Sequence, residues 1–213
     1  MNHIFEFFFE TYQNRATHLI VLECIAFFFG IASVIYAKRE NILVYPVGLV
    51  ATVITVYIFF HDGLMGDMTM NFYYSVMSIY GWWNWSRKKD DTYMVPISKT
   101  TSKEKWIGFG MFLITMIATF MIYKAFGTEI DSSNYIDIFT SGIFFTAMWF
   151  MANKKLENWT LWIFADLITV PLYAYRGWGM LSLQYLIFTI LAIQGYLAWK
   201  KSLNKSQQQT PTV

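Results

Sequence analysis

Residues 106–126 read WIGFGMFLITMIATFMIYKAF, a stretch in which Lys124 is the only charged residue. Crossing the roughly 30 Å of hydrocarbon in a bilayer takes about 20 helical residues, so this stretch predicts a transmembrane helix. It stands near the middle of the chain, and three similar runs are expected on each side of it. These runs are 18–36, 41–60, 67–85, 133–152, 156–175 and 178–199.

The composition of the whole chain agrees with a membrane protein. Of 213 residues, 56% are hydrophobic and only 14% are charged, whereas a soluble domain carries about 25% charged residues. The net charge of +2 is spread over several loops, so we expect no nucleic-acid partner. Cys24 is the only cysteine, and the three histidines lack zinc-type spacing. No disulfide, metal site or cofactor is therefore expected.

The sequence divides into three parts. Residues 1–17 place aromatic side chains at helical spacing, with acidic and amide groups opposite, which is typical of a helix lying in the membrane interface. Residues 18–199 hold the seven apolar runs, as a first unit (18–85), a linking helix (106–126) and a second unit (133–199). Residues 200–213 are expected to form a polar tail on the cytoplasmic side.

Positive charges predict the orientation, because loops rich in Lys and Arg remain in the cytoplasm. Of the 16 Lys and Arg residues, 13 lie on the side that holds the loop 86–105 and the end of the chain. Arg15, Lys124 and Arg176 lie on the other side. We therefore expect a multi-pass protein of the bacterial inner membrane, with its N-terminus outside and its C-terminus inside.

The two units resemble each other in sequence. Glu40–Asn41 and Glu157–Asn158 open equivalent runs, and Thr52 matches Thr169 at the same offset. After a shift of three residues, 81–85 (GWWNW) matches 195–199 (GYLAW). A single linking helix returns the chain to its starting side, so both units insert in the same direction. Such a 3+1+3 parallel repeat predicts a substrate site between the units, near the bilayer midplane.

Polar side chains inside the apolar runs are costly, so those present point to a site. Trp159, Trp162, Asp166 and Thr169 recur at spacings of three and four, which places two indoles, a carboxylate and a hydroxyl on one helical face. The structural alternative is an inward carboxylate bonded to a neighbouring helix. Glu23 also lies inside a run, but it has no comparable companions.

A second polar face occurs in the run 67–85. Asn71, Tyr74, Ser78 and Trp82 follow at steps of three, four and four, so they share a face that should look at protein or a cavity rather than at lipid. Hydrogen bonding between helices would explain the same pattern. In the last run, the side chains of Gln184 and Gln194 should also point inward.

Motifs for competing functions are missing from the sequence. The last run has no lysine at mid-membrane for a retinal Schiff base, and there is no Gly-x-Ser-x-Gly, His-Glu-x-x-His or Walker motif. An enzyme is therefore not expected. A receptor or sensor would need an output domain, and a purely structural subunit would leave both polar faces without a ligand.

Two stretches resemble the PnuC family of bacterial vitamin transporters. The first is Asn71-x-x-Tyr74-x-x-x-Ser78-x-Tyr80-Gly81-Trp82-x-x-Trp85, and the second runs from Glu157 through Trp159, Trp162, Asp166 and Pro171 to Tyr173. This resemblance implies a fold similar to that of SWEET sugar transporters, nicotinamide riboside as the commonest substrate, and facilitated diffusion completed by a cytoplasmic kinase. It also implies a homotrimer as the possible assembly.

The resemblance leaves the vitamin open, because relatives of this kind also carry thiamine or riboflavin. Nicotinamide riboside and thiamine both contain a cationic aromatic ring, which suits indole faces and a carboxylate. We expect nicotinamide riboside, with thiamine as the alternative. The residues expected to bind it are Asn71, Tyr74, Ser78, Trp82, Trp159, Trp162, Asp166, Tyr173, Gln184 and Gln194.

Overall fold

A computed structural model describes residue 12 and residues 15–63, 65–89, 92–93, 95–125 and 132–208 of the chain. This part of the protein forms seven long helices, which confirms the all-helical membrane fold expected from the sequence. The helices are α2 (Thr17–Lys38), α3 (Val44–His61), α4 (Met65–Ser86), α5 (Ser102–Ala125), α6 (Ser132–Ala152), α7 (Glu157–Tyr175) and α8 (Gly179–Gln208).

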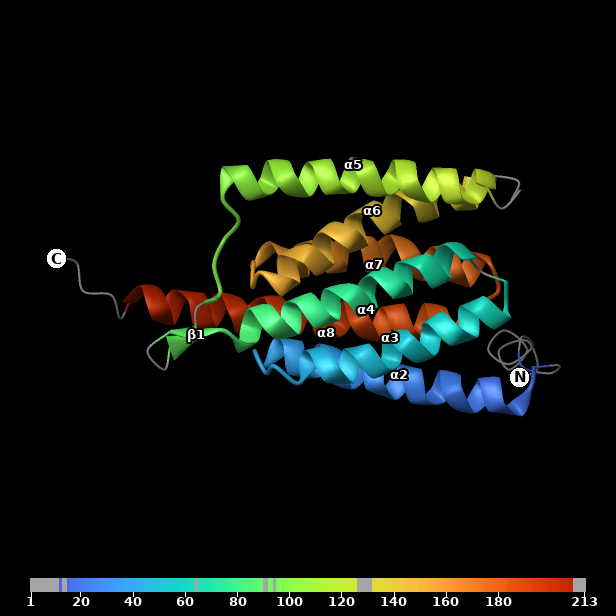
Figure 1. Ribbon diagram of the computed structural model, residues 1–213, viewed down its shortest axis with the longest axis horizontal. Coiled ribbons are helices and arrows are strands. Elements are labelled where there is room, and N and C mark those ends of the chain that lie inside the picture. Colours follow the sequence, from blue (N-terminus) through green and yellow to red (C-terminus); the bar gives the residue numbers. More distant parts are fainter. Residues whose placement is uncertain are drawn as a thin grey trace.

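Six of the helices form a closed ring, and α5 stands outside it. Around the ring the order is α2, α3, α4, α6, α7, α8 and back to α2, and α5 packs mainly against α6 (Figure 1). The first helix of each unit thus touches the third helix of the other unit. This arrangement confirms the 3+1+3 repeat, because α2, α3 and α4 correspond to α6, α7 and α8.

The helices lie roughly side by side, so the bundle has two ends. We call the end where α2 begins the Arg15 end, and the end where α2 finishes the Trp199 end. Beyond the Trp199 end, α8 continues as a single helix to Gln208. The first part of the predicted tail, residues 200–208, is therefore helical, and Leu203 on this extension is buried.

The first predicted segment, residues 1–17, lies outside the described residues except for Tyr12 and residues 15–17.

The linker between α4 and α5 holds a small feature that the sequence did not predict. Its strands β1 (Lys88–Lys89) and β2 (Thr92–Tyr93) pair in antiparallel fashion.

The structure corrects the register of the repeat. Glu40 and Lys154 both have a positive φ, at 55° and 49°, in the turns between the first and second helices of the two units, and they are 114 positions apart. The same offset relates Thr55 to Thr169, whose hydroxyls each bond to the carbonyl four residues earlier. One offset therefore holds throughout, without a shift of three residues. Glu40 lies in the turn and does not open the second helix.

Two tryptophans close the ring at the Trp199 end. The indole Nε1 of Trp199 donates to the carbonyl oxygen of Ala37 at 3.0 Å, and that of Trp85 donates to the carbonyl oxygen of Ala152 at 3.2 Å. Carbonyl groups at the end of a helix have no partner in their own helix. Each unit thus supplies an indole donor to the end of the other unit's first helix, in addition to the Glu40 N–H that reaches the Ala37 carbonyl at 3.0 Å and the Asn84 amide that reaches the Ala152 carbonyl at 2.9 Å.

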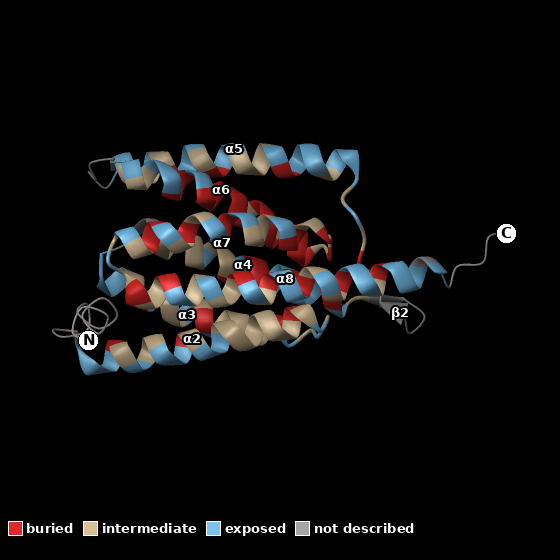
Figure 2. Ribbon diagram, turned by 180° about the vertical axis from the view of Figure 1, so that it is seen from behind, coloured by how far each residue is buried: buried red, intermediate tan, exposed pale blue. Residues whose placement is uncertain are grey.

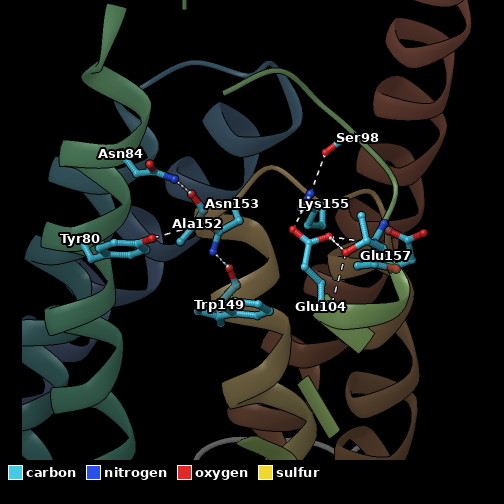
Figure 3. A network of polar contacts seen from close by, with 11 residues as sticks. Tyr80, Asn84, Ser98, Glu104, Trp149, Ala152, Asn153, Lys155 and Glu157 are labelled. Carbon is cyan, nitrogen blue, oxygen red and sulfur yellow. Dashed lines mark hydrogen bonds and ion pairs between the residues drawn. The ribbon is translucent and has the colours of Figure 1, made fainter. Parts of the chain in front are cut away.

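Polar contacts hold the linker between α4 and α5 against the turn between α6 and α7 (Figure 3). The ammonium group of Lys155 lies 2.7 Å from a carboxylate oxygen of Glu104 and donates to Ser98 Oγ at 3.0 Å. The backbone N–H of Thr100 donates to Glu157 Oε2 at 2.9 Å. These contacts fix the start of α5 against the second unit, whereas the linker that leads into α5 comes from the first unit.

Burial fits a bundle surrounded by lipid. The helix α6 is the most buried, because it lies between α4, α5 and α7 (Figure 2). On α5, by contrast, Trp106 and Ile114 expose 73% and 69% of their surface. Five helices, α2, α3, α5, α6 and α8, are long and apolar enough by themselves to cross a membrane. The other two, α4 and α7, carry the polar faces singled out in the sequence.

Candidate functional site

The ring encloses a cavity of about 500 Å³, a size in the range of pockets for small ligands. Side chains from all six ring helices line the cavity, and none comes from α5. The lining extends from residues at the Arg15 end, such as Asp62 and Trp178, to buried residues near the Trp199 end, such as Ala37. The cavity therefore lies along the axis of the ring, between the two repeat units.

Four aromatic rings pack below the cavity at the Trp199 end. The ring centroids of Tyr45 and Trp85 are 5.1 Å apart, and those of Trp159 and Trp199 are 5.4 Å apart. A Cβ atom at Gly81 would come within 2.2 Å of the Tyr45 ring, so α3 and α4 can approach this closely only at a glycine. Because all four rings are buried, this end of the cavity is tightly closed.

An aromatic cluster, drawn mainly from the second unit, lines one part of the cavity. Trp162 on α7 lies with its ring centroid 5.3 Å from Phe144 on α6 and 6.2 Å from Tyr74 on α4. Tyr185 on α8 continues the cluster, at 5.9 Å from Phe144 and 5.2 Å from Tyr173. Four different helices therefore surround one space with the faces and edges of aromatic rings.

Asp166 stands in the same region, one helical turn after Trp162. It is 1% exposed, and neither of its carboxylate oxygens has a hydrogen-bond partner in the described part of the chain. Tyr74 and Tyr185 lie close enough to interact electrostatically with this carboxylate. A buried ionised carboxylate is costly unless it is paired. A carboxylate among aromatic rings is an arrangement that binds a cation with a flat, apolar body.

Smaller polar groups line the part of the cavity that belongs to the first unit. Thr52 on α3 accepts a hydrogen bond from Ser75 on α4, at 2.8 Å between the two hydroxyl oxygens. The amide nitrogen of Asn71 donates to the carbonyl oxygen of Asp67 at 3.0 Å. Thr52, Asn71 and Ser78 all line the cavity, so this side offers hydroxyl and amide groups beside its own rings, which include Phe27 and Tyr45.

Charged clusters hold the helices together at the Arg15 end. Arg15 Nη2 lies 2.7 Å from Asp62 Oδ2 and 3.7 Å from Glu23 Oε2, which ties the start of α2 to the end of α3. In the second unit, Arg176 Nη1 lies 3.4 Å from Asp137 Oδ2. Glu23 and Asp137 are again 114 positions apart. Glu23, whose role the sequence left open, therefore occupies the position that Asp137 occupies in the second unit, whereas Arg176 stands at the position equivalent to Asp62.

The structure brings most of the predicted binding residues together. Those that line the cavity are Asn71, Tyr74, Ser78, Trp159, Trp162, Asp166, Tyr173 and Gln184. Trp82 and Gln194 do not. Trp82 is 42% exposed, and the exposed amide of Gln194 accepts a hydrogen bond from Lys38 at 2.8 Å.

Several cavity residues were missed by the sequence analysis. Phe144 and Tyr185 are aromatic residues in apolar runs, and nothing in the sequence distinguishes them from lipid-facing residues. Only the arrangement of the ring helices shows that they line the cavity. Tyr185 directly follows Gln184, but helical spacing alone does not show that both reach the cavity. Gly30 has no side chain, and no sequence pattern marked it.

A ring of long helices, most of them apolar enough to cross a membrane, around a ligand-sized cavity is the arrangement of a helical membrane transporter, and comparisons with known proteins agree. Residues 20–201 match the nicotinamide mononucleotide transporter family. The chain belongs to this family, which is that of the PnuC transporters.

Individual relatives span nearly the whole chain. The "Nicotinamide riboside transporter PnuC" of Escherichia coli is 26% identical over 91% of this chain and 95% of its own length. The "Riboflavin/roseoflavin transporter RibM" of Streptomyces davaonensis is 21% identical over 85% of each chain. A crystal structure of "the Vitamin B3 transporter PnuC" has a TM-score of 0.69 at 21% identity, and the match covers 86% of this chain and 82% of that one. The last likeness shows the fold.

Proposed function

We propose that this protein carries nicotinamide riboside into the cell by facilitated diffusion across the bacterial inner membrane. A cytoplasmic kinase would complete uptake by phosphorylating the vitamin, because a phosphorylated product no longer fits a passive carrier. The observation that carries the proposal is Asp166, a buried carboxylate without a partner among the described residues, beside the aromatic cluster of Trp162, Phe144 and Tyr74. A pyridinium ring would supply the positive charge that Asp166 lacks as a partner, and its flat faces would pack against the rings of the cluster.

The charge of the cavity as a whole supports a cationic substrate. Five carboxylates line it against one guanidinium group, and an excess of one sign in a low-dielectric cleft raises the local concentration of the opposite ion. These charged lining residues are Arg15, Glu23, Asp62, Asp67, Asp137 and Asp166.

Thiamine is the second candidate, since it also carries a cationic aromatic ring. Riboflavin, which the name of one relative mentions, has a neutral ring system and would leave Asp166 unpaired. We therefore place it third. A receptor or sensor role is not favoured, because the described residues form a transporter ring and no separate output domain.

Equilibrium binding to the purified protein tests the proposal. Radiolabelled nicotinamide riboside, thiamine and riboflavin would be compared at the same ionic strength, with nicotinamide as a neutral control. We expect nicotinamide riboside to bind most tightly and nicotinamide to bind at least about tenfold more weakly. Tighter binding of riboflavin than of both cationic vitamins would overturn the proposal.

A further inference from the structure

The 114-residue offset pairs each cavity residue of one unit with a counterpart in the other. On α2 and α6 the pairing holds along the helices, since Glu23 matches Asp137 near the start and Glu40 matches Lys154 in the turn after the end. Under this offset, Gly30 of α2 corresponds to Phe144 of α6. Both residues line the cavity, so the same position carries a ring in one unit and no side chain in the other.

The packing of the protein does not require a residue without a side chain at Gly30. A Cβ atom added there would lie 3.5 Å from Phe188 Cζ and 3.8 Å from Gln184 Nε2, both ordinary van der Waals distances. Glycine within a helix is unfavourable compared with alanine, and Gly30 has no positive φ to justify it. By contrast, Gly48 is needed sterically, because its Cβ would come within 2.7 Å of Ser33 Oγ.

Other pairs show the same difference between the two sides of the cavity. Asp166 corresponds to Thr52, and Trp162 corresponds to Gly48. At these three paired positions the second unit presents the larger group, a carboxylate or a ring, and the first unit presents a hydroxyl or no side chain, although rings such as Tyr74 of the first unit line the cavity elsewhere. A ligand that fits both sides has a cationic ring at one end and a bulky group rich in hydroxyls at the other.

We propose that Gly30 determines specificity by leaving room on the α2 side of the cavity for the hydroxyl-bearing part of the substrate, while its cationic ring lies against Asp166. This inference rests on the proposed function, because it divides that substrate between the two sides. Asp166 points independently to a ligand in this cavity, since both of its oxygens are buried without a partner in the described chain.

The test fills the space in two steps. Gly30→Ala adds one methyl group at ordinary contact distances, and Gly30→Phe copies the residue that stands at the equivalent position of the second unit. Gly110→Ala and Gly110→Phe are the matched controls, because a Cβ atom at Gly110 on α5 would meet no atom within 4 Å. Gel filtration and thermal unfolding would show that each variant is folded.

Binding would be measured for nicotinamide riboside and for 1-methylnicotinamide, which keeps the cationic ring and replaces the ribose with a methyl group. We expect Gly30→Phe to weaken binding of nicotinamide riboside by about tenfold or more, with a smaller loss for Gly30→Ala. Binding of 1-methylnicotinamide should stay within about twofold of the unmodified protein, and both Gly110 variants should bind like it.

The possible results separate this inference from the proposed function. If the unmodified protein binds neither nicotinamide riboside nor thiamine, the proposed function fails. If it binds nicotinamide riboside and Gly30→Phe binds it equally well, only the inference about Gly30 fails. The inference also fails if Gly30→Phe loses both ligands to the same degree, or if the unmodified protein binds nicotinamide riboside but not 1-methylnicotinamide.

Discussion

The indole of Trp199 and the carbonyl oxygen of Ala37 form a hydrogen bond across 162 positions of sequence. It joins the last helix of the ring to the first, and Trp85 with Ala152 makes the equivalent contact on the opposite side of the ring. The two bonds link the repeat units to each other at the Trp199 end. The ion pairs at the Arg15 end, Arg15–Asp62 and Arg176–Asp137, lie within single units.

Replacing Trp199 with phenylalanine should destabilise the protein. Phenylalanine keeps most of the ring but removes one of the two hydrogen bonds to the Ala37 carbonyl, which also accepts the Glu40 N–H at 3.0 Å. Losing a typical hydrogen bond costs about 0.5–1.5 kcal/mol. Thermal unfolding in detergent would measure the loss as a lower midpoint. Trp82→Phe is the control, because Trp82 is largely exposed and lies off the cavity. Equal midpoints for the two variants would contradict the role of the bond.

The variant Trp162→Ala should weaken vitamin binding. It removes a stacking surface from the aromatic cluster, and stacking of a base on an aromatic side chain contributes roughly 1–3 kcal/mol. The dissociation constant should therefore rise about tenfold or more. Trp106→Ala serves as the control, since that indole lies on the outer face of α5. Unchanged binding by a folded Trp162→Ala protein would place the pocket elsewhere.

Asp166→Asn should distinguish charged from neutral ligands. The substitution keeps the size of the side chain and removes its charge, so a cationic ring loses its counter-charge while a neutral ring does not. Affinity for nicotinamide riboside should fall about tenfold or more, and affinity for riboflavin should not fall. Glu40→Gln makes the same chemical change in a turn outside the cavity. A similar loss for both variants would argue against a direct contact with the cation.

The orientation in the membrane remains a prediction from charge. With 13 of 16 Lys and Arg residues on the side of the loop 86–105, the C-terminus should be cytoplasmic and the N-terminus periplasmic. A reporter that is active only in the periplasm, fused after Val213, should therefore give no signal. A strong signal from that fusion would reverse the assignment of the two ends of the bundle.

Transport should be passive. Coupling to protons or sodium requires ionisable groups or exposed carbonyls near the substrate that are free to bind the coupling ion, and Asp166 stays ionised to hold its substrate in our proposal. In proteoliposomes at equal pH and sodium, labelled vitamin should exchange with unlabelled vitamin inside. Accumulation above the external concentration, driven by either gradient without a kinase, would show that this interpretation of Asp166 is incorrect.

Hydrophobic length and helical spacing predicted the helices, and eight of the ten expected binding residues line the cavity. Asn71, Tyr74 and Ser78 share a polar face of α4 that is unfavourable against lipid, and they do line the cavity. The same spacing led to Trp82, which lies off the cavity for a geometric reason. Near the end of α4 the inward positions are Gly81 and Trp85, because Tyr45 and Ala152 pack there.

Contacts between distant helices were harder to predict. Gln194 was expected to point inward as a polar residue in an apolar run, but Lys38 from the neighbouring helix binds it at the surface. Phe144 and Tyr185 look like any lipid-facing residues in the sequence. Only the closed order of the ring helices brings them to Trp162, and that order follows from packing over more than 100 residues of chain.

The closed ring also bears on how the chain is made. Each unit supplies an indole donor to a carbonyl near the end of the other unit's first helix, so a single unit released alone would lose that hydrogen bond. The helices leave the ribosome in order, so α2 cannot form its hydrogen bond with Trp199 until α8, the last helix, has entered the membrane. Until then the cavity has an open side, and its polar residues face lipid. A chain cut before Trp199 would be left at this stage, as a target for quality-control proteases.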